Sequence, residues 1–564
     1  MASAPDWLPI ARWLPRYHRA DLLGDLGASI VVAVLLIPQS MAYAMLAGLP
    51  PATGLYASTL PLLAYALFGH GMTQSVGPMA LTSLMTADAL ASVLASGHDA
   101  LAAACVLALL SGAMLMAFGL LRLGRITRLL SLPVVSGFTS GTAILIALGQ
   151  LGPLLGVRLA GEQAPALLAQ LPWALRDATG SVLGFGLAAL IGFWLIGDVL
   201  VTQLQRTRLN TRTVLLLGRL APVALLAALT ALATSRGGLA TVGALPRLQL
   251  AWSWPDASLE LVAALWLPAL LIGLVGYLQS LTIARTLAAQ RRETVDADQE
   301  LLALGAANLA AGSIGGMPVS GGFSRTAVNA GAGARTPLAG VYTACWIVLA
   351  GTWLTPWLAL LPKAALAATI VLAALKLIDW RQLRASWRYD KRDGAALLAT
   401  LAVTLLFGAM PGIASGVLLS LALYIQRTSQ PQIVTLGRLL GSEHFRNVER
   451  FSTETWPQLT LLRIDENLYF GNARAVEEGV LARATRETRD LVLVLSGVAS
   501  IDYSAAGMLA ELEGQLAERG VRLYLAELKM ALHEQLASNG LLQPLLARSF
   551  LNPHQAVEVL LTPP

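Results

Sequence analysis

The chain has 564 residues, of which 56% are hydrophobic and only 13% are charged. Soluble domains carry about 25% charged residues, so this composition excludes an ordinary soluble protein and indicates one that crosses a membrane many times. The net charge of +6 comes mostly from arginine, and the arginines form short clusters between apolar runs. That distribution is typical of cytoplasmic loops, and we therefore expect no nucleic-acid partner.

Little in the sequence points to an enzyme or to a cofactor. Cys105 and Cys345 both lie in apolar runs, without the spacing of a disulfide framework or a metal site. The apolar part has no phosphate-binding loop and no paired carboxylates. We therefore expect a protein that is not an enzyme and that binds no metal or cofactor.

Residues 1–20 and 21–428 differ in character. The first segment mixes aromatic residues with arginines, as interfacial segments do: Trp7, Arg12, Trp13, Arg16, Tyr17 and Arg19. The second contains about fourteen apolar runs, some of them shorter than the roughly 20 residues that a membrane span needs. The predicted spans are Leu26–Leu46, Thr53–Phe68, Val76–Leu94, Leu101–Leu120, Leu130–Leu151, Val182–Leu200, Val214–Ala233, Leu261–Ala284, Glu300–Ala311, Gly322–Ala332, Leu338–Trp357, Ala364–Ile378, Ala395–Ala409 and Ile413–Ile425.

The arginine clusters predict the orientation of the spans. If the spans alternate, all of the clusters fall on one side, which the positive-inside rule makes cytoplasmic. The N-terminus and the segment after Arg427 fall on the same side. The clusters are Arg122–Arg125–Arg128, Arg206–Arg208–Arg212, Arg285–Arg291–Arg292 and Arg381–Arg384–Arg388–Lys391–Arg392.

Two stretches interrupt the spans with glycine and proline. Gln74–Thr82 opens the third predicted span, and Gly312–Thr336 opens the tenth. About seven spans lie between the two openings, and an odd number inverts the second repeat relative to the first, which predicts repeats of about 21–235 and 258–428. Interruptions at corresponding positions of two repeats are typical of a transporter's binding site, although a pair of ordinary proline kinks would look similar.

Arg325 makes the second stretch a candidate anion site. An arginine at bilayer depth costs about 2.5 to 3.5 kcal/mol on insertion scales and usually has a ligand or pathway role. A helix beginning near Gly322 would add the partial positive charge of its free N–H groups to that of Arg325. The alternative is that Arg325 extends to the cytoplasmic surface and that the glycines only allow close helix packing.

The composition changes after Ile425. Leu459–Ile464, Leu491–Leu495 and Val521–Leu525 are predicted strands, and Ala473–Thr488, Ser504–Arg519 and Lys529–Ser538 are predicted helices. Alternating strands and helices indicate a small α/β domain, which we place at 445–564, cytoplasmic and joined by a linker at 429–444.

Several motifs together resemble the SulP family of anion transporters, called solute carrier family 26 in animals. They are Ile37–Ala44 (IPQSMAYA), Ala47–Pro51 followed by Gly54–Tyr56, Ser75–Ala80, and Gly321–Thr326 (GGFSRT). Gly497–Ser504 is similar to the strand-to-helix turn of a STAS domain. The resemblance implies an α-helical polytopic membrane protein with about fourteen spans in two inverted repeats, divided into a core and a gate, followed by a STAS domain. It also implies a homodimer and an elevator-like movement of the core.

Matched motif by motif, Gln39, Tyr43, Met79, Ser324 and Arg325 fall on the family's anion site. An amide, a phenol, a hydroxyl and a guanidinium are suitable donors for an anion. Without the motifs, Gln39 could be an amide at a helix interface, Tyr43 an interfacial ring and Met79 a packing residue.

Gln279 is a departure from the family pattern. Many relatives have an acidic residue there that resembles the coupling group for a proton or sodium ion, and an amide cannot ionise. We still expect Gln279 in the substrate pocket, across from Arg325. Asp88 is an alternative coupling group, but it lies about ten residues past Pro78, roughly 15 Å along a helix, and is expected near the outer surface.

Ser504 occupies the position of a phosphorylatable serine in stand-alone STAS proteins. The family pattern continues with glycine, whereas this chain has Ala505. We therefore favour a helix N-cap role for Asp502 or Ser504 and keep regulation at Ser504 as the alternative.

The combined expectation is a secondary transporter of small anions in the cell inner membrane. Sulfate is the first choice, ahead of bicarbonate, chloride or a dicarboxylate, and the STAS domain is expected to have a protein partner. One alternative is a nucleobase carrier of the same fold, which the charge of Arg325 disfavours. Another is a membrane-anchored signalling protein whose output is the STAS domain.

Overall fold

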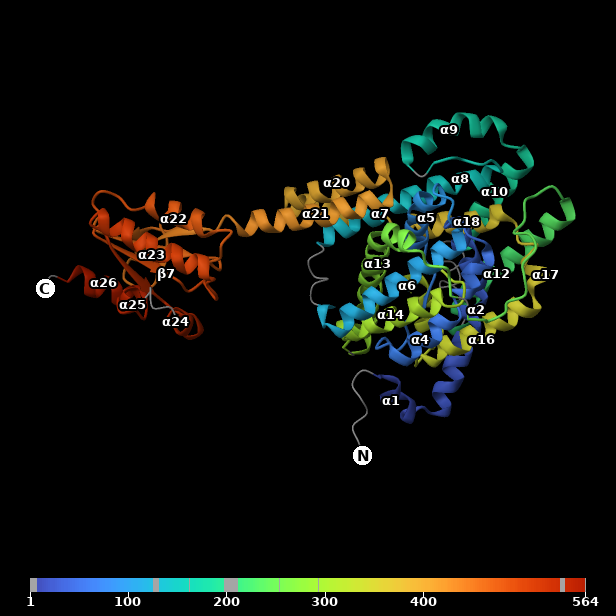
Figure 1. Cartoon of the computed structure of the whole chain (residues 1–564), viewed down its shortest axis with the longest axis horizontal. Coiled ribbons are helices and arrows are strands. Elements are labelled where there is room, and N and C mark those ends of the chain that lie inside the picture. The colour runs from blue at the N-terminus through green and yellow to red at the C-terminus, as the bar shows by residue number, and fades with distance from the viewer. Residues whose placement is uncertain are drawn as a thin grey trace. The chain divides into compact units, whose positions relative to one another are not determined.

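The computed structural model describes residues 8–124, 131–161, 163–196, 211–252, 254–292, 294–537 and 543–562. The chain forms two compact units, Met1–Ser420 and Leu421–Pro564 (Figure 1). Trp7 and the loop residues Arg125, Arg128, Arg206 and Arg208 lie outside the described residues.

Each span predicted in the first repeat contains helix. Two predicted spans, Thr53–Phe68 and Leu130–Leu151, are each divided between two helices. The elements are α1 (Ile10–Trp13), η1 (Leu14–Arg16), α2 (Arg19–Leu46), α3 (Pro51–Tyr56), α4 (Leu60–Phe68), β1 (Val76–Gly77), α5 (Ala80–Leu94), α6 (Ala100–Leu120), α7 (Leu132–Gly149), α8 (Leu151–Leu155), α9 (Ala164–Asp177), α10 (Gly180–Trp194) and α12 (Thr211–Arg236).

The second repeat also contains helix at each predicted span. Figure 1 shows α14 of this repeat packed beside α6 of the first. The elements are α13 (Leu259–Arg291), α14 (Ala297–Gly312), β2 (Ser320–Gly321), α15 (Phe323–Gly331), α16 (Leu338–Trp353), α17 (Thr355–Leu358), α18 (Lys363–Leu375), α19 (Trp380–Tyr389), α20 (Lys391–Phe407) and α21 (Ala409–Thr428).

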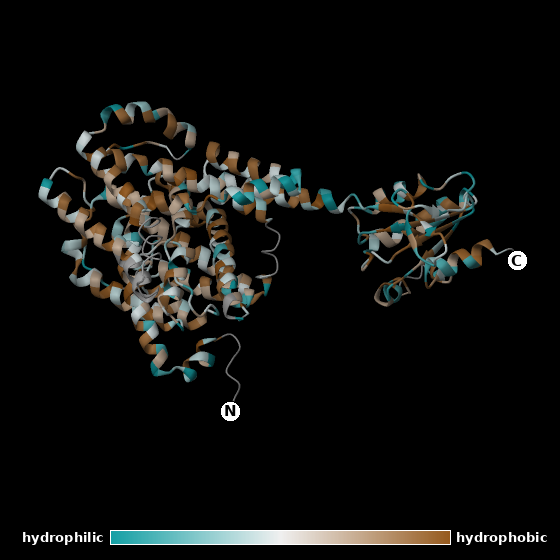
Figure 2. Cartoon of the chain, turned by 180° about the vertical axis from the view of Figure 1, so that it is seen from behind, coloured by the Kyte–Doolittle hydropathy of each residue, from teal (hydrophilic) through white to brown (hydrophobic). Residues whose placement is uncertain are grey.

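Not every helix could cross a bilayer alone. Among the described residues, 5 helices are long and apolar enough, and the pair α9 and α10, bent by 118°, would make a sixth span. The apolar helices α5 and α16 are shorter, and α5 is largely buried by neighbouring helices. A short helix is tolerated at membrane depth where protein rather than lipid surrounds its ends. Figure 2 shows apolar residues predominating along the helices of the first unit, with hydrophilic residues more frequent in the second.

Two helices, α9 and α19, lie between the predicted spans and were not predicted. Both are amphipathic. Helix α19 has three arginines among its apolar residues, and α9 has Gln170 and two prolines before its charged end, so neither forms the continuous apolar run by which spans were identified. Neither segment is therefore among the predicted spans.

The second unit is an α/β domain with a 7-stranded sheet in the order β4-β3-β6-β7-β8-β9, with β5 paired to β3. Strands β6 to β9 are parallel, whereas β3 is antiparallel to β6, with Ile433 opposite Ile464. The elements are β3 (Ile433–Leu439), β4 (Phe445–Asn447), β5 (Thr453–Glu454), β6 (Leu459–Ile464), α22 (Ala473–Leu481), β7 (Asp490–Val494), α23 (Tyr503–Glu518), β8 (Arg522–Ala526), α24 (Met530–Ala537), α25 (Gln543–Leu546), β9 (Ser549–Phe550) and α26 (Pro553–Leu561).

Strand β3 lies within 429–444, the range predicted as a linker, so the sheet begins before residue 445. Its residues are mostly half-buried, whereas all five residues of β7 are buried. The fully buried strands give continuous apolar runs, and a partly exposed strand such as β3 does not. The sequence therefore indicated the inner strands and not this one.

Candidate functional site

The two interrupted stretches meet in a short antiparallel ladder. Val76 pairs with Gly321 and Gly77 with Ser320, which places β1 beside β2. The ladder is extended by Gly322 N–H, which donates to Ser75 O at 3.3 Å, and by Ser75 N–H, which donates to Thr326 Oγ1 at 3.2 Å. The ladder therefore holds the start of α5, after Met79, next to the start of α15, after Gly322.

Three buried polar side chains position the backbone of this crossing. Asn308 of α14 accepts from Val319 N–H at 2.9 Å and donates to Val319 O at 3.0 Å. Ser280 of α13 accepts from Gly321 N–H at 2.5 Å, and Asn329 of α15 donates to Thr73 O at 2.9 Å. None of the three was predicted as a site residue, although each is a polar residue within or beside an apolar run.

Arg325 lies in the first turn of α15 and is 4% exposed. One terminal nitrogen, Nη2, donates to Pro78 O at 2.9 Å, which connects α15 to the segment before α5. Nε and Nη1 are buried and have no hydrogen-bond partner among the described residues. The guanidinium therefore has two nitrogens, Nε and Nη1, that remain available as strong donors for an anionic ligand.

A cavity of about 260 Å³ adjoins this guanidinium. Gln39 of α2 and Ser324 and Arg325 of α15 provide its polar groups on one side. Apolar side chains of α10 and α12 form the facing wall, including Phe193, Trp194 and Leu226. Helix α18 and the residue that follows it also line the cavity: Thr369, Leu372, Ala373 and Lys376.

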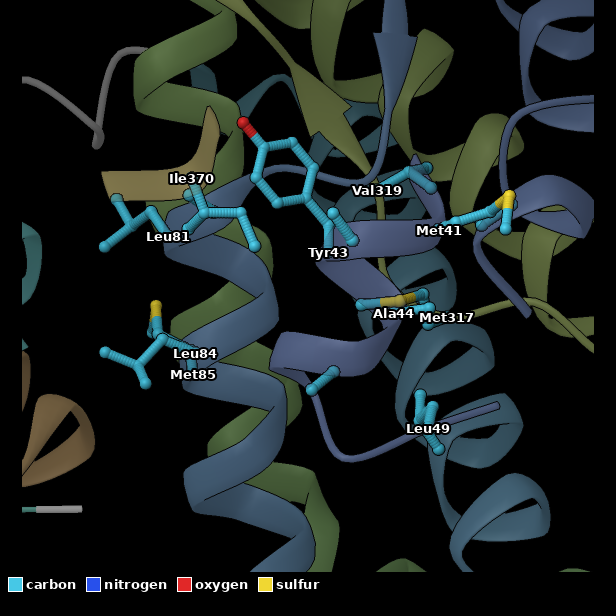
Figure 3. Close-up of a cluster of buried hydrophobic side chains, with 14 of the residues drawn as sticks. Met41, Tyr43, Ala44, Leu49, Leu81, Leu84, Met85, Met317, Val319 and Ile370 are labelled. Carbon is cyan, nitrogen blue, oxygen red and sulfur yellow. The ribbon is translucent and has the colours of Figure 1, made fainter. Parts of the chain in front are cut away.

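Tyr43 supports the cavity indirectly. Its hydroxyl accepts a hydrogen bond from Gln39 Nε2 at 2.8 Å, and its side chain is 2% exposed. Figure 3 shows the Tyr43 side chain within a cluster of buried apolar residues that includes Leu81 of α5 and Val319. Tyr43 is not among the residues that line the cavity, so the structure gives it the position of a group that orients Gln39.

Met79 and Gln279 also lie outside the cavity lining. Met79 is the residue before α5, and its Sδ would contact a Cβ placed on Gly322. Gln279 is half-buried on α13, next to Ser280, which holds β2, and its Oε1 is buried without a hydrogen-bond partner among the described residues. The structure therefore places Gln279 near the crossing but does not place it opposite Arg325 across the cavity.

Lys376 is a second basic residue at the cavity and was not predicted as a site residue. It follows the last residue of α18, and its side chain is exposed. In the sequence it belongs to a predicted apolar span, Ala364–Ile378. It is nevertheless one of the residues that line the cavity.

Asp88 has a structural partner. Its Oδ2 accepts from Met410 N–H at 2.7 Å, in the first turn of α21. This is the arrangement of a carboxylate that satisfies a free N–H at a helix N-terminus. Helix capping accounts for Asp88 without a role in ion coupling.

The strand-to-helix turn of the second unit has Asp502 as the N-cap of α23. Asp502 Oδ1 accepts from Ala505 N–H at 2.8 Å, and Oδ2 accepts from Phe470 N–H at 2.8 Å. Ser504, two residues after Asp502, is exposed and makes no described side-chain hydrogen bond. Of the two cap candidates, the structure therefore assigns the cap to Asp502.

Comparison with known proteins identifies similar sequences along the whole chain. A family description of the sulfate permease family matches residues 22–400, and one of the STAS domain matches residues 450–556. A protein of Arabidopsis thaliana named sulfate transporter 4.1, chloroplastic, is 32% identical over 579 residues, covering 99% of this chain and 83% of the relative. A probable sulfate transporter of Mycobacterium tuberculosis is 33% identical over 557 residues, covering 96% of this chain and 95% of the relative.

The fold is similar to that of a solved structure. The murine solute carrier 26 family member A9 anion transporter, in the inward-facing state, superposes with a TM-score of 0.88 at 21% identity. The superposition covers 99% of this chain and 95% of the other. The predicted transmembrane fold with a STAS domain is confirmed by this similarity together with the two family matches.

Proposed function

Because the chain belongs to the sulfate permease family, we propose that it is a secondary transporter that carries small anions across a membrane, with sulfate as the first candidate. The two relatives with sequence similarity are named a sulfate transporter and a probable sulfate transporter, and their similarity covers nearly all of this chain. Sulfate is a small oxyanion, and guanidinium, amide and hydroxyl donors suit its oxygen atoms.

One observation carries the proposal: Arg325 is buried at a cavity with two nitrogens that have no partner among the described residues. No Asp or Glu of the described chain forms an ion pair with Arg325. Leaving a charged group buried and unpaired is costly, and an anion in the cavity would offset that cost. We propose that this anion is the substrate, held between the first turns of α5 and α15.

The remaining site residues have supporting roles in this proposal. Gln39 and Ser324 would donate hydrogen bonds to the anion, and Tyr43 would hold the Gln39 amide in place. Met79, which lies outside the cavity lining, would pack against Gly322 at the start of α15, beside the anion. The free backbone N–H groups of two helix starts would add partial positive charge. The buried positive charge of Arg325 favours an anion over a neutral nucleobase.

The helix packing supports an elevator mechanism. Helices α2 to α6 pack mainly with α13 to α16, and α7, α8, α10 and α20 pack mainly with one another and with α18. The proposed anion site is on the first group, and apolar residues of the second group face it across the cavity. We propose that the first group is the core, that the second is the gate, and that the core slides past the apolar wall with the bound anion.

We further propose an inner-membrane location with the N-terminus and the STAS domain in the cytoplasm. The arginine clusters on one side of the predicted spans support this orientation. A homodimer and a protein partner for the STAS domain complete the proposal, in line with the family's organisation.

Uptake of labelled sulfate into liposomes that contain the purified protein tests the transport proposal. We expect uptake above that of empty liposomes, and competition by unlabelled oxyanions but not by nucleobases. Competition by bicarbonate, chloride or a dicarboxylate would rank the other candidates. An intact, folded protein that moves none of these anions would contradict transport and favour the sensor alternative.

A further inference from the structure

Helix α19 has two kinds of exposed side chain on adjoining sides. Arg381, Arg384 and Arg388 follow one another at intervals of three and four residues, which places them on one side of the helix. Trp380 and Trp387 lie on the adjoining side and are 64% and 47% exposed. We call these five residues the α19 face.

The position of α19 is fixed by the rest of the unit. Asp379 caps the helix by accepting from Arg381 N–H at 3.0 Å and from Gln382 N–H at 2.9 Å. Ser386 is buried on the side of α19 that packs against α7 and α20. Trp387 packs closely against Gly394 of α20. A Cβ at residue 394 would lie only 2.6 Å from Trp387 Cε3, so the contact requires glycine. The helix is therefore anchored through its buried side and through one edge of Trp387, while the arginines, Trp380 and the rest of the Trp387 ring remain exposed.

Within the described chain, no acidic side chain forms an ion pair with an arginine of the α19 face. All three arginines are exposed, and none forms an ion pair within the described chain. The nearby acids are Asp379, Asp390 and Asp393, and the first two are helix N-caps that accept backbone N–H groups. Lys391 and Arg392 add further positive charge at the start of α20.

The location of α19 next to two spans favours a membrane surface as its partner. It connects α18 with α20, both of which lie in predicted spans, so its ends are close to where the chain enters the bilayer. Exposed tryptophans beside arginines are typical of helices that lie at the boundary of headgroups and acyl chains. Arginine side chains form strong charge-assisted hydrogen bonds with phosphate.

We propose that the α19 face binds anionic phospholipid, with the arginines on the phosphate groups and the tryptophans among the upper acyl chains. Helix α18 lines the cavity beside Arg325, so a lipid bound at α19 contacts the segment that continues from a wall of the proposed transport site. This interaction does not depend on the identity of the transported substrate.

Tryptophan quenching by brominated lipids tests the proposal in the full-length protein. The protein is reconstituted into phosphatidylcholine bilayers that contain an equal mole fraction of dibrominated phosphatidylglycerol or dibrominated phosphatidylcholine. We expect the wild type to be quenched more by the anionic lipid, and the excess to disappear in Trp380→Phe/Trp387→Phe, which removes the reporting rings.

The triple variant Arg381→Gln/Arg384→Gln/Arg388→Gln should lose the preference for the anionic lipid. A basic residue near an anionic surface contributes about 1 kcal/mol, so three together correspond to a fall in selectivity of up to roughly a hundredfold. The matched control is Arg450→Gln/Arg486→Gln/Arg489→Gln, which removes three exposed charges from the second unit and should keep the preference.

Equal quenching of the wild type by both lipids would overturn the proposal, as would an excess that persists in the α19 triple variant. Size-exclusion profiles verify that each variant is folded. If the triple variant is unstable, the single variant Arg384→Gln replaces it, and we expect a smaller loss of the preference for the anionic lipid. The measurement needs no transport, so a protein that fails to carry sulfate could still confirm or contradict lipid binding.

Discussion

The guanidinium of Arg325 is the residue on which the proposed site depends most. We expect Arg325→Ala to weaken sulfate binding by roughly tenfold to a hundredfold, because a charge-assisted hydrogen bond contributes about 1.5 to 3 kcal/mol. Arg325→Lys should restore only part of the affinity, since an ammonium lacks the planar fork of donors. Uptake at several sulfate concentrations in liposomes measures both variants.

Arg335 provides the matched control for this substitution. It belongs to the same interrupted stretch, but its side chain is 57% exposed and pairs with Asp21 at 3.2 Å. An exposed ion pair of this kind contributes little, so Arg335→Ala should leave sulfate affinity unchanged. Wild-type affinity in Arg325→Ala would show that the anion binds elsewhere.

Gln279 stands where many relatives have an acidic residue, so this chain lacks an ionisable group at that position. Without a carboxylate there, we expect sulfate transport by the wild type to depend little on a proton or sodium gradient. Gln279→Glu should introduce a pH dependence: at high pH the ionised carboxylate competes with the anion for the positive site, and at low pH the neutral acid does not. Uptake from about pH 5 to about pH 8 should therefore show lower affinity at the alkaline end for the variant only.

Gln279→Met separates this electrostatic effect from packing. Methionine has a similar size and cannot ionise, so its uptake should show no new pH dependence. If the wild type were strongly driven by a proton gradient, a group other than Gln279 would have to perform the coupling. The capping contact of Asp88 with α21 makes that residue a weak candidate.

At the scale of single elements, the turn before α23 offers a test of helix capping. Asp502→Ala removes the acceptor of two backbone N–H groups and should lower the free energy of unfolding of the STAS unit by about 1 to 2 kcal/mol. Urea denaturation of the fragment 421–564 measures the change. Ser504→Ala, which removes no described side-chain hydrogen bond, should lie within about 0.5 kcal/mol of the wild type, as surface substitutions usually do.

Most of the membrane spans and strands that the sequence predicted contain a continuous apolar run. The apolar runs predicted the spans, and the buried strands β6, β7 and β8 appear within one residue of their predicted bounds. Helix α19 and strand β3 were missed because each combines exposed or half-buried residues with residues packed against protein. Such elements lack a continuous apolar run, and their stability comes from tertiary contacts.

The candidate site was predictable only in part, because some of its contacts join segments that are far apart in the sequence. Glycine, proline and arginine within an apolar stretch indicated where the helices break, and hence Arg325. The contributions of Asn308, Ser280 and Asn329 depend on hydrogen bonds to backbone atoms of distant segments. No spacing within one segment specifies such pairs, and Lys376 likewise reaches the cavity only through the packing of α18.

For the whole molecule, the division into two units predicts the effect of a truncation. Deleting Gln430–Pro564 keeps α21 complete and removes all of the sheet. The spans should still insert, because their apolar runs and loop charges remain. We expect sulfate flux or dimer stability to fall, as measured in liposomes and by mass photometry. Dimers and flux equal to those of the full-length protein would contradict any regulatory or structural role for the STAS domain.

The ladder between β1 and β2 also has a consequence for biosynthesis. Arg325 and Pro78, which hydrogen-bond across it, are 247 residues apart in the chain. At about 5 to 20 residues per second, the ribosome needs roughly 12 to 50 seconds to extend the chain from one to the other. During that interval the start of α5 is inserted without its partner, with its backbone donors unpaired at membrane depth. The first half of the nascent chain must therefore be shielded from lipid, by an insertase or by its own earlier helices, until the second half arrives.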